Sequence, residues 1–166
     1  GAYYVMEKAA PDGFVVGKEP SEVVFVYKDQ DTPVVEQEVT VKNERQKVEI
    51  TVEKQDAENG TVLSGAVFGI YNQEDIVVDG KVIVEAGTLL QEMTSDEKGL
   101  ARCTLDLPLG KYFVKELKPP AGYVTSDEIL EFDASYQGQE VQMVKLKSAV
   151  KNQPTTVEIT KSDATT

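Results

Sequence analysis

Hydrophobic and polar residues alternate with a period of two along most of the chain. Short stretches rich in valine, isoleucine, tyrosine and phenylalanine are separated by turn residues, which is the pattern of β-strands. The predicted strands read KVEITVEK, GAVFGIYN, GKVIVEAG, ARCTLDL, KYFVKEL, EILEFDA and EVQMVKLKSAV. No segment of helical length carries an apolar stripe with a period of about 3.6 residues. The sequence therefore predicts an all-β fold built as a β-sandwich.

Turn residues mark where the predicted strands end. Asn59-Gly60, Asp79-Gly80, DEKG at 96–99 and PPAG at 119–122 are typical turn sequences. The stretch QEDIVVDGKVIVEAG has an apolar run on each side of Asp79-Gly80. We expect this stretch to form a hairpin that decorates one edge of the sandwich.

The chain contains an internal repeat with an offset of 109 residues. GAYYVMEKAAPDGF at the start matches LGKYFVKELKPPAGY, and VTVKN (39–43) matches SAVKN (148–152) at the same offset. VEITVEKQDAENG, from Val48, has a shorter echo in VEITKSDATT, from Val157. The repeat predicts three parts in a fragment of a tandem array: the C-terminal part of a preceding repeat (1–45), a complete domain (46–154) and the first strand of a following repeat (155–166).

Three predicted strands carry one polar residue each on their apolar side. Lys54 follows the parity of the valines in VEITVEK, Glu116 that of Tyr112 and Val114, and Asn152 that of Val150. Each could be a strand end at which the side chain emerges into water. However, the incomplete repeats carry the same residue types at the same parity, and the equivalents are Glu7, Asn43 and Lys161. Recurrence supports a role, although duplication alone could also preserve the pattern.

A lysine, a glutamate and an asparagine buried together form a reactive set. Burial disfavours the charged forms of an amine and a carboxyl group. A neutral amine is a nucleophile, and a neighbouring carboxyl group can move protons to and from the reacting amide. We therefore expect an amide bond between Lys54 and Asn152, with Glu116 as the acid–base catalyst of a reaction that occurs once.

The amino-acid composition disfavours several other classes of function. The net charge of −12 disfavours nucleic acid and anionic membranes as partners, and the absence of histidine disfavours ordinary acid–base or metal chemistry. We expect no cofactor and no metal, and we expect the acidic pairs Asp127-Glu128 and Asp29/Asp31 to be solvated. The single cysteine, Cys103, alternates with Ala101 and Leu105, which predicts a packed core thiol. No apolar run reaches membrane-spanning length, and no signal peptide is recognisable in this stretch of sequence.

The chain resembles the B-type repeats of Gram-positive collagen adhesins and the related SpaA-type pilin domains, which are called CnaB-like. The resemblance rests on VEKQDAENGTVLSGAVFGIYN (52–72), LPLGKYFVKELKPPAGY (107–123) and VKN (150–152). It implies a prealbumin-like, reverse-immunoglobulin sandwich with an isopeptide bond between Lys54 and Asn152 and a catalytic Glu116. It also implies a structural stalk or backbone module of an extracellular, cell-wall-anchored adhesin or pilus rather than an enzyme with turnover.

Two further alternatives remain open from the sequence. Lys161 of one molecule could complete the Glu7 and Asn43 piece of another as a donated strand, in a head-to-tail chain, or both incomplete ends could be frayed.

A carbohydrate- or protein-binding sandwich without a cross-link is the alternative function. The 73–92 region is its best candidate insertion, but the chain has no tryptophan for a sugar platform. No sortase signal is recognisable, because LPLGK (107–111) lacks the threonine.

Overall fold

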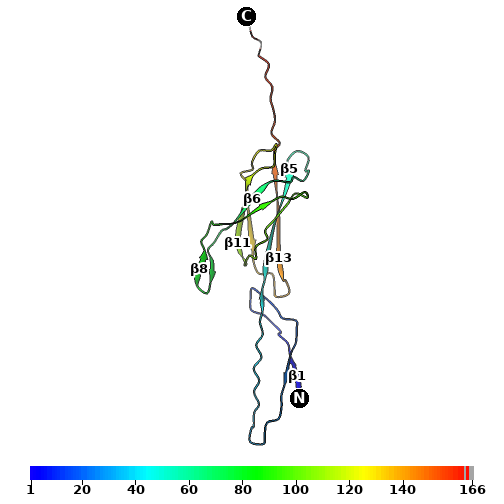
Figure 1. The fold of residues 1–166 in the computed structure, drawn as a ribbon, viewed down its shortest axis with the longest axis vertical. Helices are drawn as coiled ribbons and strands as arrows, with labels where there is room; N and C mark the ends of the chain where they lie inside the picture. Colours follow the sequence, from blue (N-terminus) through cyan, green and yellow to red (C-terminus); the bar gives the residue numbers. More distant parts are fainter. Residues whose placement is uncertain (163, 165–166) are drawn as a thin grey trace. The chain divides into compact units, whose positions relative to one another are not determined.

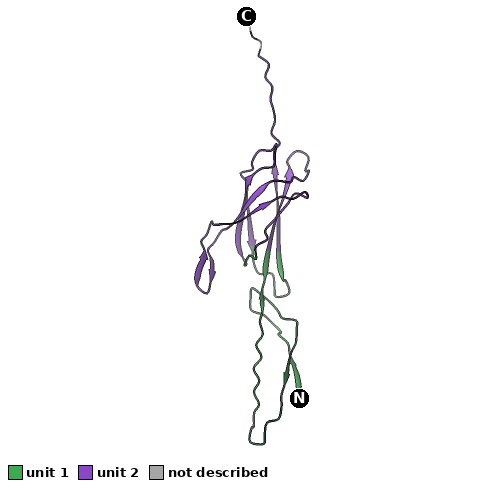
Figure 2. Cartoon of the chain, viewed as in Figure 1, with its two compact units in different colours: residues 1–48, 106–109, 134–144 green, residues 49–105, 110–133, 145–166 purple. Residues whose placement is uncertain are grey.

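All regular structure in the part of the chain that we describe is β-structure. The computed structural model describes residues 1–162 and 164, and it contains strands and no helix within them. The chain divides into two compact units, coloured separately in Figure 2. Unit 1 comprises Gly1–Val48, Asp106–Leu109 and Ala134–Val144, and unit 2 comprises the remaining segments, 49–105, 110–133 and 145–166.

Two sheets form the sandwich (Figure 1). In the three-stranded sheet, β5 (Lys47–Asp56) lies between β10 (Leu100–Arg102) and β13 (Met143–Asn152). The four-stranded sheet has the order β12 (Ile129–Ala134), β11 (Gly110–Lys118), β6 (Val67–Asn72), β9 (Leu89–Thr94). Their inward side chains form the core of unit 2, and the fully buried members include Ile50, Val52, Phe68, Ile70 and Val114. The alternation in the sequence thus becomes one buried and one exposed face on each sheet.

The predicted hairpin is confirmed. β7 (Ile76–Val78) pairs with β8 (Lys81–Val84) in antiparallel fashion. Asp79 and Gly80 join them with φ angles of 50° and 74°. Two consecutive positive φ values define the tight turn that suits the right-handed twist of a hairpin, and the Asp-Gly pair supplies them at low cost.

The strand predicted over ARCTLDL is shorter than expected, since β10 ends at Arg102. The amide of Cys103 still donates to the carbonyl of Ile50 at 2.9 Å, but the next amide, that of Thr104, donates to the Gln91 side chain at 3.0 Å. A side chain therefore takes the place of a strand partner, and the ladder stops. Cys103 is buried as predicted, whereas Leu105, predicted on the same inward face, is exposed.

Unit 1 contains four short strands in two pairs. β1 (Ala2–Val5) pairs with β3 (Ser21–Val24), and β2 (Phe14–Val15) pairs with β4 (Glu44–Arg45). Gln46 is the buried polar centre of this unit: its amide nitrogen donates to the carbonyls of Gly138 and Val141, at 3.0 and 2.6 Å. Its side-chain oxygen accepts from the amide of Gln137 at 3.0 Å.

Two further stretches have the alternation of the predicted strands but form no strand. The stretch VTVKN (39–43) and the stretch VEIT from Val157 carry no strand in the structure. Both have the right alternation, but a strand also needs a neighbouring backbone for its hydrogen bonds, and the described residues provide neither stretch with one. The alternation within a stretch does not indicate whether another backbone segment is available to pair with it.

Candidate cross-linking site

Lys54, Glu116 and Asn152 meet in the core of unit 2, and the strands that carry them explain why. Along β5, every second side chain from Val48 to Lys54 is buried, and Lys54 itself has no exposed surface. Glu116 occupies the corresponding inward position of β11, and Asn152 that of β13. The alternative that these are strand ends emerging into water is therefore wrong: the side chains of Lys54 and Glu116 are fully buried, and Asn152 is 1% exposed.

The three side chains form one hydrogen-bonded network. The Lys54 ammonium nitrogen, Nζ, donates to Asn152 Oδ1 in a short hydrogen bond and to the carbonyl of Val150 at 3.0 Å. Nζ also lies 3.9 Å from Glu116 Oε1. On the other side, Asn152 Nδ2 donates to both carboxylate oxygens of Glu116 at 2.9 Å. The asparagine amide is thus held between the amine and the carboxylate.

The position of Glu116 depends on two features of the backbone. The amide of Ser126 donates to Glu116 Oε2 at 2.7 Å, which adds a backbone donor to the contacts that the carboxylate makes with Asn152. The pairing of β11 with β6 shifts register between Glu116 and Lys118, so a bulge follows the glutamate directly. Such a bulge changes the direction of a strand locally. Neither the Ser126 amide nor the Val150 carbonyl was predicted, because backbone groups leave no trace in a side-chain pattern.

Burial makes the amine of Lys54 easier to deprotonate. Loss of solvent lowers the pKa of Lys54 below its ordinary value of 10.5, while the negative charges of Glu116 and Glu128 oppose this shift. The nucleophile is therefore closer to its neutral form than a lysine in water. Because Asn152 Oδ1 is bonded to the carbonyl carbon, the amine already lies beside the atom that it would attack.

The equivalent residues in unit 1 form half of the same arrangement. In unit 1, Asn43 Nδ2 donates to Glu7 Oε1 at 2.7 Å, and the amide of Gly17 donates to Glu7 Oε2 at 2.7 Å. Asn43 Oδ1, however, is buried without a hydrogen-bond partner in the part of the chain that we describe. The structure thus brings Glu7 and Asn43 together, whereas Lys161 lies on an exposed segment of unit 2.

The remaining candidate residue, Cys103, is part of the core. Its thiol lies 3.3 Å from Gln91 Oε1, and burial raises its pKa. A thiol in this state is a poor nucleophile. A search of the described residues for clusters of three or more His, Cys, Asp and Glu side chains that could hold a metal ion finds none. Within these residues there is also no helix with the length and hydropathy needed to cross a membrane.

The sandwich and its buried triad define a prealbumin-like surface-protein domain. The model of the SpaA family, a prealbumin-like fold domain, matches residues 48–149, more than half of the 166-residue chain. The chain belongs to this family. Lys54 and Glu116 lie within the matched residues, whereas Asn152 lies three residues beyond their end, in the last part of β13.

The similar proteins are surface and pilus proteins of Gram-positive bacteria. The Trypsin-resistant surface T6 protein of Streptococcus pyogenes serotype M6 is 28% identical over 151 residues, which cover 91% of this chain and 21% of that protein. The solved Bacillus anthracis TIE protein is 32% identical with a TM-score of 0.63, over 93% of this chain and 25% of that one. The T6 backbone pilin of serotype M6 shares the fold, with a TM-score of 0.51 at 17% identity over 66% of this chain and 35% of that chain. The chain therefore spans a quarter or less of the first two relatives.

Proposed function

We propose that the chain is a structural stalk or backbone module of a cell-wall-anchored adhesin or pilus, stabilised by a self-catalysed isopeptide bond between Lys54 and Asn152. The observation that carries this proposal is the buried network in which Glu116 holds the Asn152 amide against the Lys54 amine. The similarity to surface and pilus proteins supports the setting at the bacterial cell surface.

The proposed reaction exchanges one bond for another. Glu116 accepts a proton from the Lys54 ammonium group, and the neutral Nζ attacks the side-chain carbonyl carbon of Asn152. The Nζ–Cγ bond forms and the Cγ–Nδ2 bond breaks. Glu116 passes the proton to Nδ2, which leaves as ammonia, and then takes up the second proton that Nζ loses when it becomes the amide nitrogen. The contact of Glu116 with Nδ2 supports this role, because the departing nitrogen is the atom that needs the proton.

A single turnover is sufficient for a structural bond, so the module needs no substrate beyond its own side chains. Its partners in this proposal are the neighbouring repeats of the same protein, with 46–154 as the complete domain and 1–45 and 155–166 as parts of adjacent repeats. A bond between the first and last strands of the complete domain carries tension from one neighbour to the next without reliance on a disulfide. The chain has one cysteine and cannot form an internal disulfide.

The intact mass of the denatured protein tests the proposal. We expect the parent chain to be lighter than its sequence by one ammonia, and we expect Glu116→Ala to have the full mass. Glu131→Ala, which removes an exposed glutamate from β12, is the matched control and should keep the deficit. Fragmentation should place the bond between Lys54 and Asn152. A parent chain of full mass, after prolonged incubation in the folded state, would exclude the cross-link.

A further inference from the structure

Two loops of unit 2 begin next to the residues of the candidate cross-linking site. The first is the turn at 56–61, which follows Lys54 and is closed by a hydrogen bond from the amide of Asp56 to the carbonyl of Thr61 at 2.8 Å. The second is the loop at 119–126, which follows β11 and ends at Ser126, the residue whose amide donates to Glu116. A contact between these two loops therefore bears on the relative placement of the lysine strand and the glutamate strand.

Asp56 makes this contact. It is the last residue of β5, shares the inward parity of Lys54 and is only 5% exposed. Its Oδ1 accepts from the amides of Glu58 and Asn59, at 2.7 and 3.2 Å, within the first loop. Its Oδ2 accepts from the hydroxyl of Tyr123, in the second loop, at 2.8 Å. One carboxylate thus holds its own turn with one oxygen and the neighbouring loop with the other.

The bond between Asp56 and Tyr123 joins a charged acceptor to a neutral donor. The hydroxyl of Tyr123, together with the two backbone amides, lowers the pKa of Asp56. The carboxylate in turn raises the pKa of Tyr123. Both shifts favour the ionised carboxylate and the protonated phenol, which are the states that form this hydrogen bond. Hydrogen bonds to an ionised acceptor are roughly twice as strong as those between neutral groups.

Both loops also bind the end of the asparagine strand. The amide of Ala57, directly after Asp56, donates to the backbone carbonyl of Asn152 at 3.0 Å. The amide of Val124, directly after Tyr123, donates to the carbonyl of Gln153 at 2.9 Å. The turn, the loop and the end of β13 are therefore connected to one another in a closed circuit, and the Asp56–Tyr123 bond is its side-chain link.

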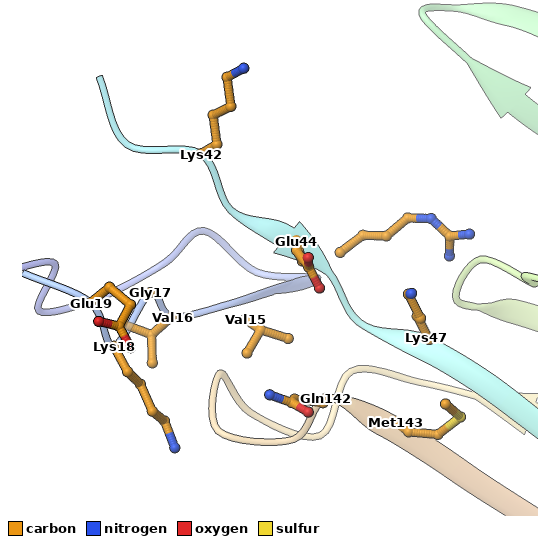
Figure 3. Close-up of a pocket in the computed structure, with 11 residues that line it drawn as sticks. Val15, Val16, Gly17, Lys18, Glu19, Lys42, Glu44, Lys47, Gln142 and Met143 are labelled. Atoms are coloured by element: carbon orange, nitrogen blue, oxygen red, sulfur yellow. The ribbon is translucent and has the colours of Figure 1, made fainter. Parts of the chain in front are cut away.

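Unit 1 repeats the backbone part of this circuit with a phenylalanine in place of the tyrosine. Phe14 lies 109 positions before Tyr123. It pairs with β4, and Tyr123 makes the equivalent bridge to Pro154. Figure 3 shows this pairing in unit 1, where Val15 marks β2 and Glu44 marks β4. Since phenylalanine keeps the backbone pairing, the hydroxyl of Tyr123 is not needed for the loop to form.

We propose that Asp56 and Tyr123 are a positioning pair for the cross-linking reaction, which fastens the turn after Lys54 to the loop after Glu116. The inference rests on the proposed function, because it concerns the rate of that reaction. The charges that act on the Lys54 amine are those of Glu116 and Glu128. Asp56 therefore acts through the backbone: it lies two residues after the lysine and directly before the amide that binds Asn152.

Variants of the pair in the full chain test the proposal through the rate of cross-linking. A short pulse of cell-free synthesis provides unreacted chains, and the loss of ammonia is then followed by intact mass. We expect Tyr123→Phe to react about tenfold more slowly than the parent, since a misplacement of about 1 Å can slow a reaction by about 100-fold. The phenylalanine in unit 1 indicates that this variant folds.

The other member of the pair provides a rescue and a double-mutant cycle. Asp56→Ala should be slowed at least as much as Tyr123→Phe. Asp56→Asn should recover most of the rate, because its amide can still bond to the hydroxyl and its oxygen to the two backbone amides. The double variant Asp56→Ala with Tyr123→Phe should be no slower than Asp56→Ala alone, because the two side chains act through one bond.

Two readouts separate positioning from a general loss of stability. Gly60→Ala strains the same turn at a positive φ, leaves both side chains in place and should react at the rate of the parent. The second readout is the pH dependence of the rate, which rises with pH as the Lys54 amine becomes neutral. Tyr123→Phe should lower the rate by the same factor at every pH. Admission of water to the site would instead move the midpoint toward the ordinary pKa of 10.5.

The outcomes distinguish this inference from the proposed function. If the parent loses no ammonia, the proposed function fails and this inference fails with it. If the parent loses ammonia and Tyr123→Phe does so at the same rate, the positioning pair is excluded while the cross-link stands. An equal slowing in Gly60→Ala, or a shifted pH midpoint in Tyr123→Phe, would also overturn the inference, because the effect would then come from stability or solvent access.

Discussion

Lys54 is the residue on which the chemistry of the site depends, because its amine must lose a proton in order to react. In the interior of unit 2 its charged form has lost water and gained only Glu116 and, less directly, Glu128 as compensating charges. The desolvation of the amine outweighs these charges, so the pKa of Lys54 falls. The same burial that activates the amine destabilises the unreacted fold.

This conflict predicts a pH dependence in a variant that cannot react. In the parent, burial lowers the folded pKa of Lys54 below the ordinary value of 10.5, and Glu116→Gln removes a charge that opposes this shift, so we expect the pKa to stay lowered in the variant. Between these two pKa values the unfolded state binds more protons, so the free energy of unfolding rises with pH. We expect a slope of up to about 1.4 kcal/mol per pH unit from this one group. Urea unfolding at several values between about pH 7 and pH 10 measures it.

The double variant Lys54→Met with Glu116→Gln is the control. It removes the buried amine and leaves the other titrating groups in place, so the difference in slope between the two variants reports Lys54 alone. Parallel curves of unfolding free energy against pH would mean that the pKa of Lys54 is the same in the folded and unfolded chains.

The inward positions of the triad residues could be predicted from the sequence, but the backbone groups that hydrogen-bond to them could not. Lys54, Glu116 and Asn152 were found because side chains on a strand alternate between its faces, so parity alone assigns them to the interior. The Ser126 amide and the Val150 carbonyl come from the backbone and depend on how distant segments meet. The roles of the three side chains in a cross-link remain predictions that the mass measurement tests.

At the scale of the strands, the turn before β10 sets the position of the lysine strand. The carbonyl of Gly99 accepts a hydrogen bond from the amide of Lys54 at 2.7 Å, and Gly99 has a φ of 73°. A Cβ atom at this position would lie 2.8 Å from the carbonyl oxygen of Lys54 and 2.8 Å from the Cβ of Val62. The backbone of β5 is therefore in contact with a position that only glycine can fill without displacement.

Gly99→Ala should accordingly weaken both the fold and the cross-link. We expect a loss of about 2–4 kcal/mol in the unfolding free energy, from the positive φ and from the contact with β5. The added Cβ would displace the backbone of β5 at Lys54. The ammonia deficit should therefore also develop more slowly after refolding, as followed by mass spectrometry over time.

Gly60→Ala is the matched control for this substitution. Gly60 has a similar φ, 75°, but an added Cβ would meet no atom within 4 Å. Gly60→Ala should lower the unfolding free energy only through the positive φ, by about 1–2 kcal/mol, and should leave the rate of cross-linking unchanged. Equal rates in the two variants would show that the contact between Gly99 and β5 does not position Lys54.

The strand predictions were correct where another segment pairs with the predicted strand. The hairpin at Asp79-Gly80 and the long strands β5 and β13 followed from alternation and turn residues, both of which are local. VTVKN (39–43) has the same alternation as the end of β13, yet it forms no strand, because β-structure requires hydrogen bonds to another segment. A pattern within one segment cannot report whether that other segment is present.

At the scale of the whole molecule, a Lys54–Asn152 bond would close a loop between residues that are 98 positions apart. By analogy with a disulfide that closes a loop of this length, the loss of unfolded-state entropy is worth about 4–5 kcal/mol. We expect Glu116→Gln to be less stable than the parent by about this amount in urea unfolding. Glutamine is the suitable replacement, since its oxygen can still accept from Asn152 and Ser126. A difference below about 1 kcal/mol would mean that the bond is absent or that the unfolded chain is already compact.

Under tension the same bond should prevent extension of the domain. A force applied to the two ends of the chain enters the sandwich through β5 and leaves through β13, and the proposed Lys54–Asn152 bond would join these strands directly. The residues between them would then bear no load, since the covalent path bypasses them. In Glu116→Gln this segment, which spans 98 positions, is free to extend by roughly 300 Å, given about 3.3–3.6 Å per residue and the extent of the folded domain. Single-molecule stretching should therefore show this step in Glu116→Gln and in Lys54→Met but not in the parent. A step of the same length in the parent would mean that load passes through the fold and not through the bond, and the proposed role in a stalk would have to be abandoned.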